Sequence, residues 1–128
     1  MGDLAREPAK SFEELVVWQK SHQLVLRVYR LSSGFPKTEV YGLTSQMRSA
    51  AVSVPANIAE AFQRRSRPDK ARLMNVAQGS LEELRYYFML SRDLGYLAIG
   101  EGWDDLDEVS RILGAYTRSL RGSPTPSS

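Results

Sequence analysis

The sequence predicts an all-α fold, an antiparallel up-and-down four-helix bundle. Apolar residues recur at three- and four-residue steps in four long segments, which is the spacing of amphipathic helices. The connections between these segments are short and carry glycine, proline or serine, which favours up-down-up-down order. No segment sustains the two-residue alternation of a β-strand.

The bulk composition is that of one soluble globular domain. The chain has 128 residues, of which 42% are hydrophobic and 25% are charged. We expect a disordered leader over residues 1–10, the bundle over 11–121 and a disordered tail over 122–128. The net charge of +2 is too small to indicate nucleic-acid binding unless cations cluster on one face.

The chain has no cysteine, which excludes disulfides, thiolate metal sites and a cysteine nucleophile. The first residues lack the apolar stretch of a secretory signal. No run approaches the roughly 20 apolar residues of a membrane span. We therefore expect a cytoplasmic protein without membrane contact and without a cofactor.

The first helix is predicted from Ser11 to about Ser33. Ser11 and Glu14 fit the Ser-x-x-Glu capping box of a helix start. Gly34 and Pro36 provide the stop signals. The expected inward stripe is Leu15, Trp18, His22, Val25 and Tyr29.

The second helix is predicted from about Thr38 to Arg65. Pro55 removes one N–H and crowds the carbonyl of Ala51, so we expect a kink there. Asn57 is expected to bind backbone groups freed by this kink. The expected inward residues are Leu43, Met47, Ala50, Val54, Ile58 and Ala61. Small residues that would let a neighbouring helix approach closely are Ser45, Ser49, Ala50, Ala51, Ser53, Ala56 and Ala59.

The third helix is predicted over 67–93, with Ser66 as N-cap, Pro68 in the first turn and Gly95 after the end. Its central stripe is Leu73, Ala77, Leu81, Leu84 and Phe88, widened by Met74, Val76, Tyr87, Leu90 and Leu94. This arc covers more than half of the circumference. Either the helix is central, or its extra face meets another subunit.

The last helix is predicted to start near Trp103 and to end at Gly122. Its first turn is acidic and its later turns carry arginines, which suits the helix dipole at both ends. The acidic residues are Asp104, Asp105 and Asp107, and the arginines are Arg111, Arg118 and Arg121. The expected inward stripe is Leu106, Val109, Leu113, Tyr116 and Leu120.

Four segments together resemble a known bacterial family. They are Trp18-Gln19-Lys20, Val54-Pro55-Ala56-Asn57-Ile58-Ala59-Glu60, Ala77-Gln78-Gly79-Ser80-Leu81-Glu82-Glu83-Leu84 and Asp93-Leu94-Gly95-Tyr96. The chain is similar in these segments to the four-helix-bundle proteins encoded in the intervening sequences of 23S ribosomal RNA genes. The resemblance extends from about Phe12 to Arg121. One departure is Ala61, where the family usually has glycine.

The resemblance implies an up-and-down bundle that assembles into a ring, a homopentamer, without established catalytic activity. A relative of this family is the accessory variability determinant of diversity-generating retroelements. It forms a basic ring that binds a reverse transcriptase and nucleic acid. By analogy, RNA or DNA and a nucleic-acid enzyme such as a reverse transcriptase are possible partners of this chain, although fold alone does not fix function.

The strongest functional candidate is a basic cluster between the second and third helices. It consists of Arg64, Arg65, Arg67, Lys70 and Arg72, five cations within nine residues. Such a cluster can bind phosphates with salt-dependent affinity. The competing interpretation is a solvated helix corner without a ligand. A ring of identical subunits would repeat the cluster by symmetry and strengthen its field.

The sequence does not favour an enzyme. His22 is the only histidine, has no second histidine or cysteine as a metal partner, and is expected to be buried or at an interface. The carboxylate pairs Glu82–Glu83 and Asp104–Asp105 point in different directions around their helices. We expect Arg85 and Arg92 to form salt bridges to another helix.

The sequence thus predicts a non-enzymatic, homo-oligomeric helical protein that binds nucleic acid or acts as a scaffold. The alternative is a purely structural or protein-interaction module that binds no nucleic acid. A third hypothesis, an enzyme that uses His22 or the carboxylates, is the least favoured.

Overall fold

The structure is a computed structural model that describes residues 8–121. Within this range it contains long helices and short 3-10 turns, and no strand. The helices are α2 (Val16–Ser32), α3 (Leu43–Gln63), α4 (Arg67–Asp93) and α5 (Trp103–Arg121), and the turns are η1 (Phe12–Glu14) and η2 (Lys37–Glu39). The predicted all-α fold with four helices is confirmed.

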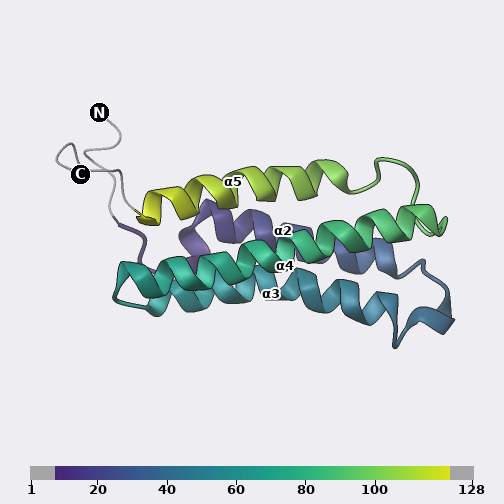
Figure 1. Cartoon of the computed structure of the whole chain (residues 1–128), viewed down its shortest axis with the longest axis horizontal. Helices are drawn as coiled ribbons and strands as arrows, with labels where there is room; N and C mark the ends of the chain where they lie inside the picture. Colours follow the sequence, from purple (N-terminus) through teal and green to yellow (C-terminus); the bar gives the residue numbers. More distant parts are fainter. Residues whose placement is uncertain (1–7, 122–128) are drawn as a thin grey trace.

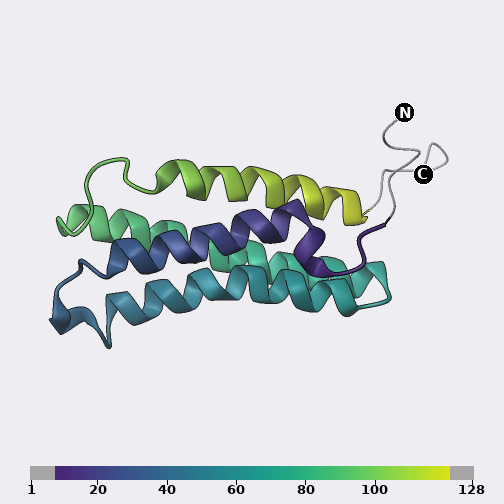
Figure 2. The same cartoon turned by 180° about the vertical axis from the view of Figure 1, so that it is seen from behind.

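The four long helices lie side by side (Figures 1 and 2). Helix α2 packs against α3 and α5, and helix α4 also packs against α3 and α5, so each helix has two neighbours. The corner between α3 and α4 lies at one end of the molecule, and the α2–α3 and α4–α5 connections lie at the other end (Figures 1 and 2). Across residues 8–121, none of the helices combines the length and the apolar character needed to cross a membrane.

Helices α4 and α5 begin at the predicted residues. The hydroxyl of Ser66 accepts a hydrogen bond from the backbone N–H of Asp69 (3.2 Å), as expected of an N-cap. Gly95, just after α4, has a φ of 82°, which favours glycine. The predicted central stripe of α4 is buried, and so is Met74, whereas Tyr87 and Leu90 are half-buried and Val76 and Leu94 are exposed. In α5, Leu106, Val109 and Leu113 are buried, and Tyr116 and Leu120 are half-buried. Gly122, the predicted end of α5, lies outside the described residues.

The predicted start of α2 is wrong. Ser11 makes no side-chain capping bond, and only η1 follows it before Leu15 adopts an extended conformation. The carboxylate of Glu14 accepts a hydrogen bond from the backbone N–H of Lys10 (3.2 Å) rather than from Ser11. The regular helix therefore begins at Val16.

The start of α3 also differs from the prediction. The turn η2 comes first, and the backbone at Gly42 is then non-helical, with φ −115° and ψ −114°. Helix α3 accordingly begins at Leu43 rather than at Thr38, and it continues through Pro55 to Gln63. All of its predicted inward residues are buried.

The inward face of α2 is not the predicted one. The buried face is centred on Val17, Ser21, Leu24 and Val28, about one residue, or roughly 100°, around the helix from the prediction. Of the predicted stripe, only Val25 is buried; Leu15 and Trp18 are half-buried, and His22 and Tyr29 are exposed. Ser21 enters the core at little cost because its hydroxyl donates to the carbonyl of Val17 (2.7 Å).

Polar side chains join α3 to α4 beside Pro55. The hydroxyls of Ser53 and Ser80 lie 2.8 Å apart and share a hydrogen bond. The side-chain amide of Asn57 donates to the carbonyl of Ser53 (2.7 Å) and to its hydroxyl (3.0 Å). Asn57 therefore has a structural role, but it binds Ser53 instead of Ala51, the residue whose carbonyl lacks the N–H of Pro55.

Candidate nucleic-acid interface

The structure brings the basic cluster together at the corner between α3 and α4 (Figure 1). Arg64 and Arg65 belong to the connection, and Arg67, Lys70 and Arg72 belong to the first two turns of α4. The carboxylates of Glu60 and Asp69 lie nearby in the chain. The side chains of the cluster nevertheless differ in whether their charges are paired within the fold.

Lys70 is turned back onto the end of α3. Its Nζ donates to the carbonyl oxygens of Ala61 (3.1 Å) and Phe62 (3.3 Å), and it lies 5.8 Å from the centroid of the Phe62 ring. The last carbonyls of a helix have no partner within the helix and form the negative end of its dipole. Lys70 therefore caps α3, and this contact occupies its charge.

Replacing Lys70 with methionine should lower the free energy of unfolding by about 1 kcal/mol, because both hydrogen bonds are lost while most of the aliphatic stem remains. Chemical denaturation measures the effect. The control is Arg72→Met, at an exposed position, which should change stability by less than about 0.5 kcal/mol. Equal effects of the two substitutions would contradict a capping role for Lys70.

Arg64 is also engaged locally. It forms an ion pair with Glu60, one turn earlier on α3. Both side chains are largely exposed, so the pair adds only roughly 0.3–0.5 kcal/mol to stability. A phosphate would have to compete with Glu60 for this guanidinium.

The remaining members of the cluster are free. Arg65, Arg67 and Arg72 are exposed, and none of them forms a hydrogen bond or an ion pair within residues 8–121. Each guanidinium presents five N–H donors in a planar fork that matches the oxygens of a phosphate. These arginines can therefore bind phosphates without first breaking a contact inside the described chain.

The other arginines considered from the sequence have structural partners. Arg85 reaches α5, where its Nη1 lies 3.1 Å from Oδ1 of Asp107, so the predicted link to another helix is confirmed. Arg92 instead pairs with Asp93 of its own helix (3.0 Å), so that prediction is wrong. Both guanidiniums lie near the Trp103 ring, at 5.8 Å and 6.0 Å, and an aromatic neighbour can hold a cation without a carboxylate.

His22 is exposed, so the expectation of a buried histidine is wrong; an interface position stays a prediction. Its ring stacks on Trp18 at a centroid distance of 5.1 Å and an angle of 9°. This contact lies at the rim of the core because the buried face of α2 is rotated away from both residues. Across residues 8–121, no group of three or more histidine, aspartate or glutamate side chains is placed to hold a metal ion.

A groove of about 420 Å³, not expected from the sequence, lies between α2 and α3. It is lined by Tyr29, Val40, Thr44, Ser45, Arg48, Ser49 and Val52. Arg48 was the available signal, because it is the only charged residue between Leu43 and Ala59, a stretch of mostly small or apolar side chains.

Comparisons with known proteins identify the family. Residues 13–115 match the family described as 23S rRNA-intervening sequence protein. The fold is similar to the crystal structure of a protein with unknown function from the S23 ribosomal protein family of Bacteroides thetaiotaomicron VPI-5482. That likeness has a TM-score of 0.68 and 23% sequence identity, and it covers 84% of this chain and 100% of the other. No curated protein compared with the chain matches it. Because the family match spans most of the sequence, the chain belongs to the 23S rRNA-intervening sequence protein family.

Proposed function

We propose that this chain is a cytoplasmic, non-enzymatic homo-oligomer that binds nucleic acid through the corner between α3 and α4. The observation that carries the proposal is the exposure of Arg65, Arg67 and Arg72 without a partner in residues 8–121. Cations that are already paired give little net attraction to phosphate, whereas free arginines release counterions from nucleic acid when they bind. A nucleic-acid enzyme such as a reverse transcriptase is the protein partner that suits this role.

Assembly would multiply this weak charge. The resemblance described above implies five copies, and a closed ring places the same corner of every copy at an equivalent position. Clustered corners would give a field that the net charge of +2 of one chain does not suggest. Filter binding with RNA and with DNA, at rising salt, tests this proposal: binding should be measurable at low salt and should weaken steeply with salt.

The outer faces of α3 and α4 supply a surface for self-assembly. Val52 of α3 and Val76 of α4 are 41% and 45% exposed, and Ala56 is exposed on α3. Apart from its chain neighbours and the backbone of its own helix, Gly79 of α4 has no atom within 4 Å of the position that a Cβ would occupy. Apolar and small side chains on adjacent outer faces suit close contact with a second copy, because interface cores are depleted of charge.

Replacing Ala56 with arginine should convert the oligomer into a species near 14.4 kDa, since a long cation would enter the proposed interface. Light scattering coupled to gel filtration measures the mass. Ala115→Arg is the matched control, an exposed alanine on α5, and it should leave the oligomer intact. A wild-type chain that runs as a single species near 14.4 kDa would refute assembly altogether.

The same proposal includes an alternating up-and-down order of the helices and a bend of α3 at Pro55. Short connections favour the alternation. The missing N–H of Pro55 and the crowding by its ring favour the bend. Residual dipolar couplings measured on both halves of α3 would test the bend, and a common axis for 43–54 and 56–63 would contradict it.

The second candidate is a structural or protein-interaction module without nucleic-acid binding. Lys70 and Arg64 favour it, because both use their charges inside the fold. This candidate predicts an oligomer that binds neither RNA nor DNA even at low salt. Filter binding and light scattering on the same preparation therefore discriminate between the two functions.

A further inference from the structure

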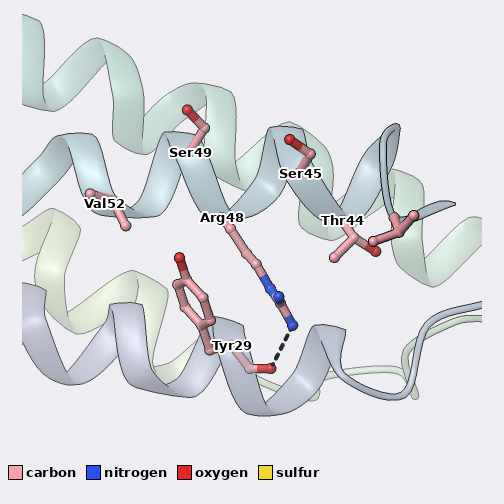
Figure 3. Close-up of a pocket in the computed structure, with 7 residues that line it drawn as sticks. Tyr29, Thr44, Ser45, Arg48, Ser49 and Val52 are labelled. Carbon is pink, nitrogen blue, oxygen red and sulfur yellow. Dashed lines mark hydrogen bonds between the residues drawn. The ribbon is translucent and has the colours of Figure 1, made fainter. Parts of the chain in front are cut away.

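The groove between α2 and α3 is built around Arg48 (Figure 3). This side chain reaches from α3 to the end of α2, where its Nε donates to the hydroxyl of Ser32 (2.8 Å) and its Nη2 donates to the carbonyl of Tyr29 (3.3 Å). Its guanidinium carbon lies 4.5 Å from the centroid of the Tyr29 ring. These contacts fix the orientation of the guanidinium.

The positive charge of Arg48 is not matched by a carboxylate. Within residues 8–121 it forms no ion pair, and its Nη1 makes no hydrogen bond. A guanidinium carries five N–H donors, so the two hydrogen bonds to α2 leave part of the fork available. The groove therefore contains an oriented cation with free donors.

The hydroxyl of Thr44 adds to these donors. Thr44 lines the groove and is only 6% exposed, yet its hydroxyl has no hydrogen-bond partner in the described part of the chain. The Thr44 oxygen itself is not fully buried, so this hydroxyl is open to solvent in the groove and can donate to a bound ligand. Thr44 also lines the smaller neighbouring pocket, of about 150 Å³, together with Arg48.

The first turn of α3 contributes backbone donors. The N–H groups of Thr44 and Ser45 have no acceptor within residues 8–121, whereas the N–H of Leu43 donates to the Glu39 carboxylate (3.2 Å). The positive end of a helix dipole favours an anion at this place. Glu39 is the nearby negative charge, and its carboxylate is also bound by the hydroxyl of Tyr96 (2.9 Å).

We propose that this groove binds a phosphate-type oxyanion between the guanidinium of Arg48 and the hydroxyl of Thr44. The volume of about 420 Å³ lies within the range of roughly 300–1,000 Å³ typical of small-molecule sites. There is thus room for a phosphate monoester of mononucleotide size. The site is separate from the basic corner, because the two lie at opposite ends of α3, about 30 Å apart at 1.5 Å per residue.

The test is a ¹H–¹⁵N NMR titration of the full chain with inorganic phosphate, against sodium chloride at equal ionic strength. Phosphate, and not chloride, should shift the amide signals of Thr44 and Ser45 and the Nε signal of Arg48 in a saturable way. Thr44→Val keeps the side-chain shape and should weaken phosphate binding about tenfold or more, since a hydrogen bond to a charged group is lost. Arg48→Gln should abolish binding.

Thr38→Val is the matched control, because Thr38 is an exposed threonine of η2 that lines neither the groove nor the neighbouring pocket. This variant should bind phosphate as the wild type does. Equal affinities of the wild type, Thr44→Val and Arg48→Gln would overturn the proposal, and so would identical responses to phosphate and chloride.

Two further probes identify the source of the oxyanion. Saturation by adenosine monophosphate would assign the groove to a free nucleotide-sized phosphate. Tighter binding of a short oligoribonucleotide that is lost in Thr44→Val would assign it to an RNA backbone. An oligonucleotide that shifts only signals of the basic corner, with no response of the groove to any phosphate probe, would overturn the proposal while leaving the corner as the nucleic-acid interface.

Discussion

Changing Arg65, Arg67 and Arg72 together to glutamate should abolish RNA binding at low salt. These side chains are exposed and unpaired in the described part of the chain, so their replacement removes phosphate contacts without breaking the fold. Each lost contact on a single strand should also reduce the slope of log affinity against log salt by roughly 0.7. Filter binding at several salt concentrations measures the affinity and the slope.

The matched control is a second triple reversal that changes the charge equally at other places. Arg30 at the end of α2, Lys37 in η2 and Arg111 on α5 are exposed cations outside the basic corner. Their conversion to glutamate should weaken binding far less, because they act only through the screened general field. Equal losses from the two triple variants would contradict a localised interface, and no loss from either would favour the purely structural module.

Stability has to be checked in the same variants. Surface substitutions that break no contact usually change the free energy of unfolding by less than about 0.5 kcal/mol each. The binding loss in the corner variant should therefore occur in a folded oligomer, with an unchanged mass by light scattering. A collapse of the oligomer in this variant alone would place the three arginines in the subunit interface instead.

The sequence predicted α4 and α5 well because their boundaries depend on local chemistry. Ser66 and Pro68 start α4 with a hydrogen bond and a fixed φ that need no distant partner. Gly95, after α4, has the positive φ that the sequence signal implies. The capping box predicted at Ser11 and Glu14 does not form: the Glu14 carboxylate accepts from the N–H of Lys10 instead, and Ser11 makes no side-chain capping bond.

The inward face of α2 could not be predicted from hydrophobicity, because in this helix a polar residue is buried and large aromatic residues are partly exposed. Ser21 is fully buried with its hydroxyl satisfied inside the helix, whereas Trp18 and Tyr29 stay at the rim. Large aromatic side chains suit such half-exposed places because they have both apolar area and a polar edge. The predicted helical spacing of the buried residues of α2 was therefore right, and the predicted direction of its buried face was wrong.

In the basic corner, too, local sequence predicted one part of the structure, and helix packing decided the rest. The sequence placed five cations together, since helix ends and a short connection bring them to one place. It could not show that Lys70 reaches back nine residues to the carbonyl of Ala61, because this contact depends on the angle between α3 and α4. Arg48 was missed for a similar reason: its partners on α2 are 16 and 19 residues away.

Replacing Gly102 with alanine should destabilise the fold by about 2–5 kcal/mol. Gly102 has a φ of 83°, which costs an L-residue roughly 1–2 kcal/mol. A Cβ there would also lie 2.6 Å from Cε2 of Phe88 and 2.9 Å from Cδ1 of Leu31. Phe88 has little freedom to move, because it is fully buried and packs edge-on against Trp103, so overpacking adds about 1–3 kcal/mol.

Gly95 and Gly100 separate the two causes. Their φ values are 82° and 85°, but apart from their chain neighbours neither has an atom within 4 Å of a Cβ position, so alanine there should incur only the backbone cost. Denaturant unfolding of the three variants measures the difference, which equals the cost of moving the Phe88 ring or Leu31. A cost of Gly102→Ala no greater than that of Gly100→Ala would mean that these side chains yield freely. If Gly102→Ala lowers the free energy of unfolding more than Gly100→Ala does, the same substitution can be made together with Phe88→Leu. A smaller loss in that background would show that the Phe88 ring positions the start of α5.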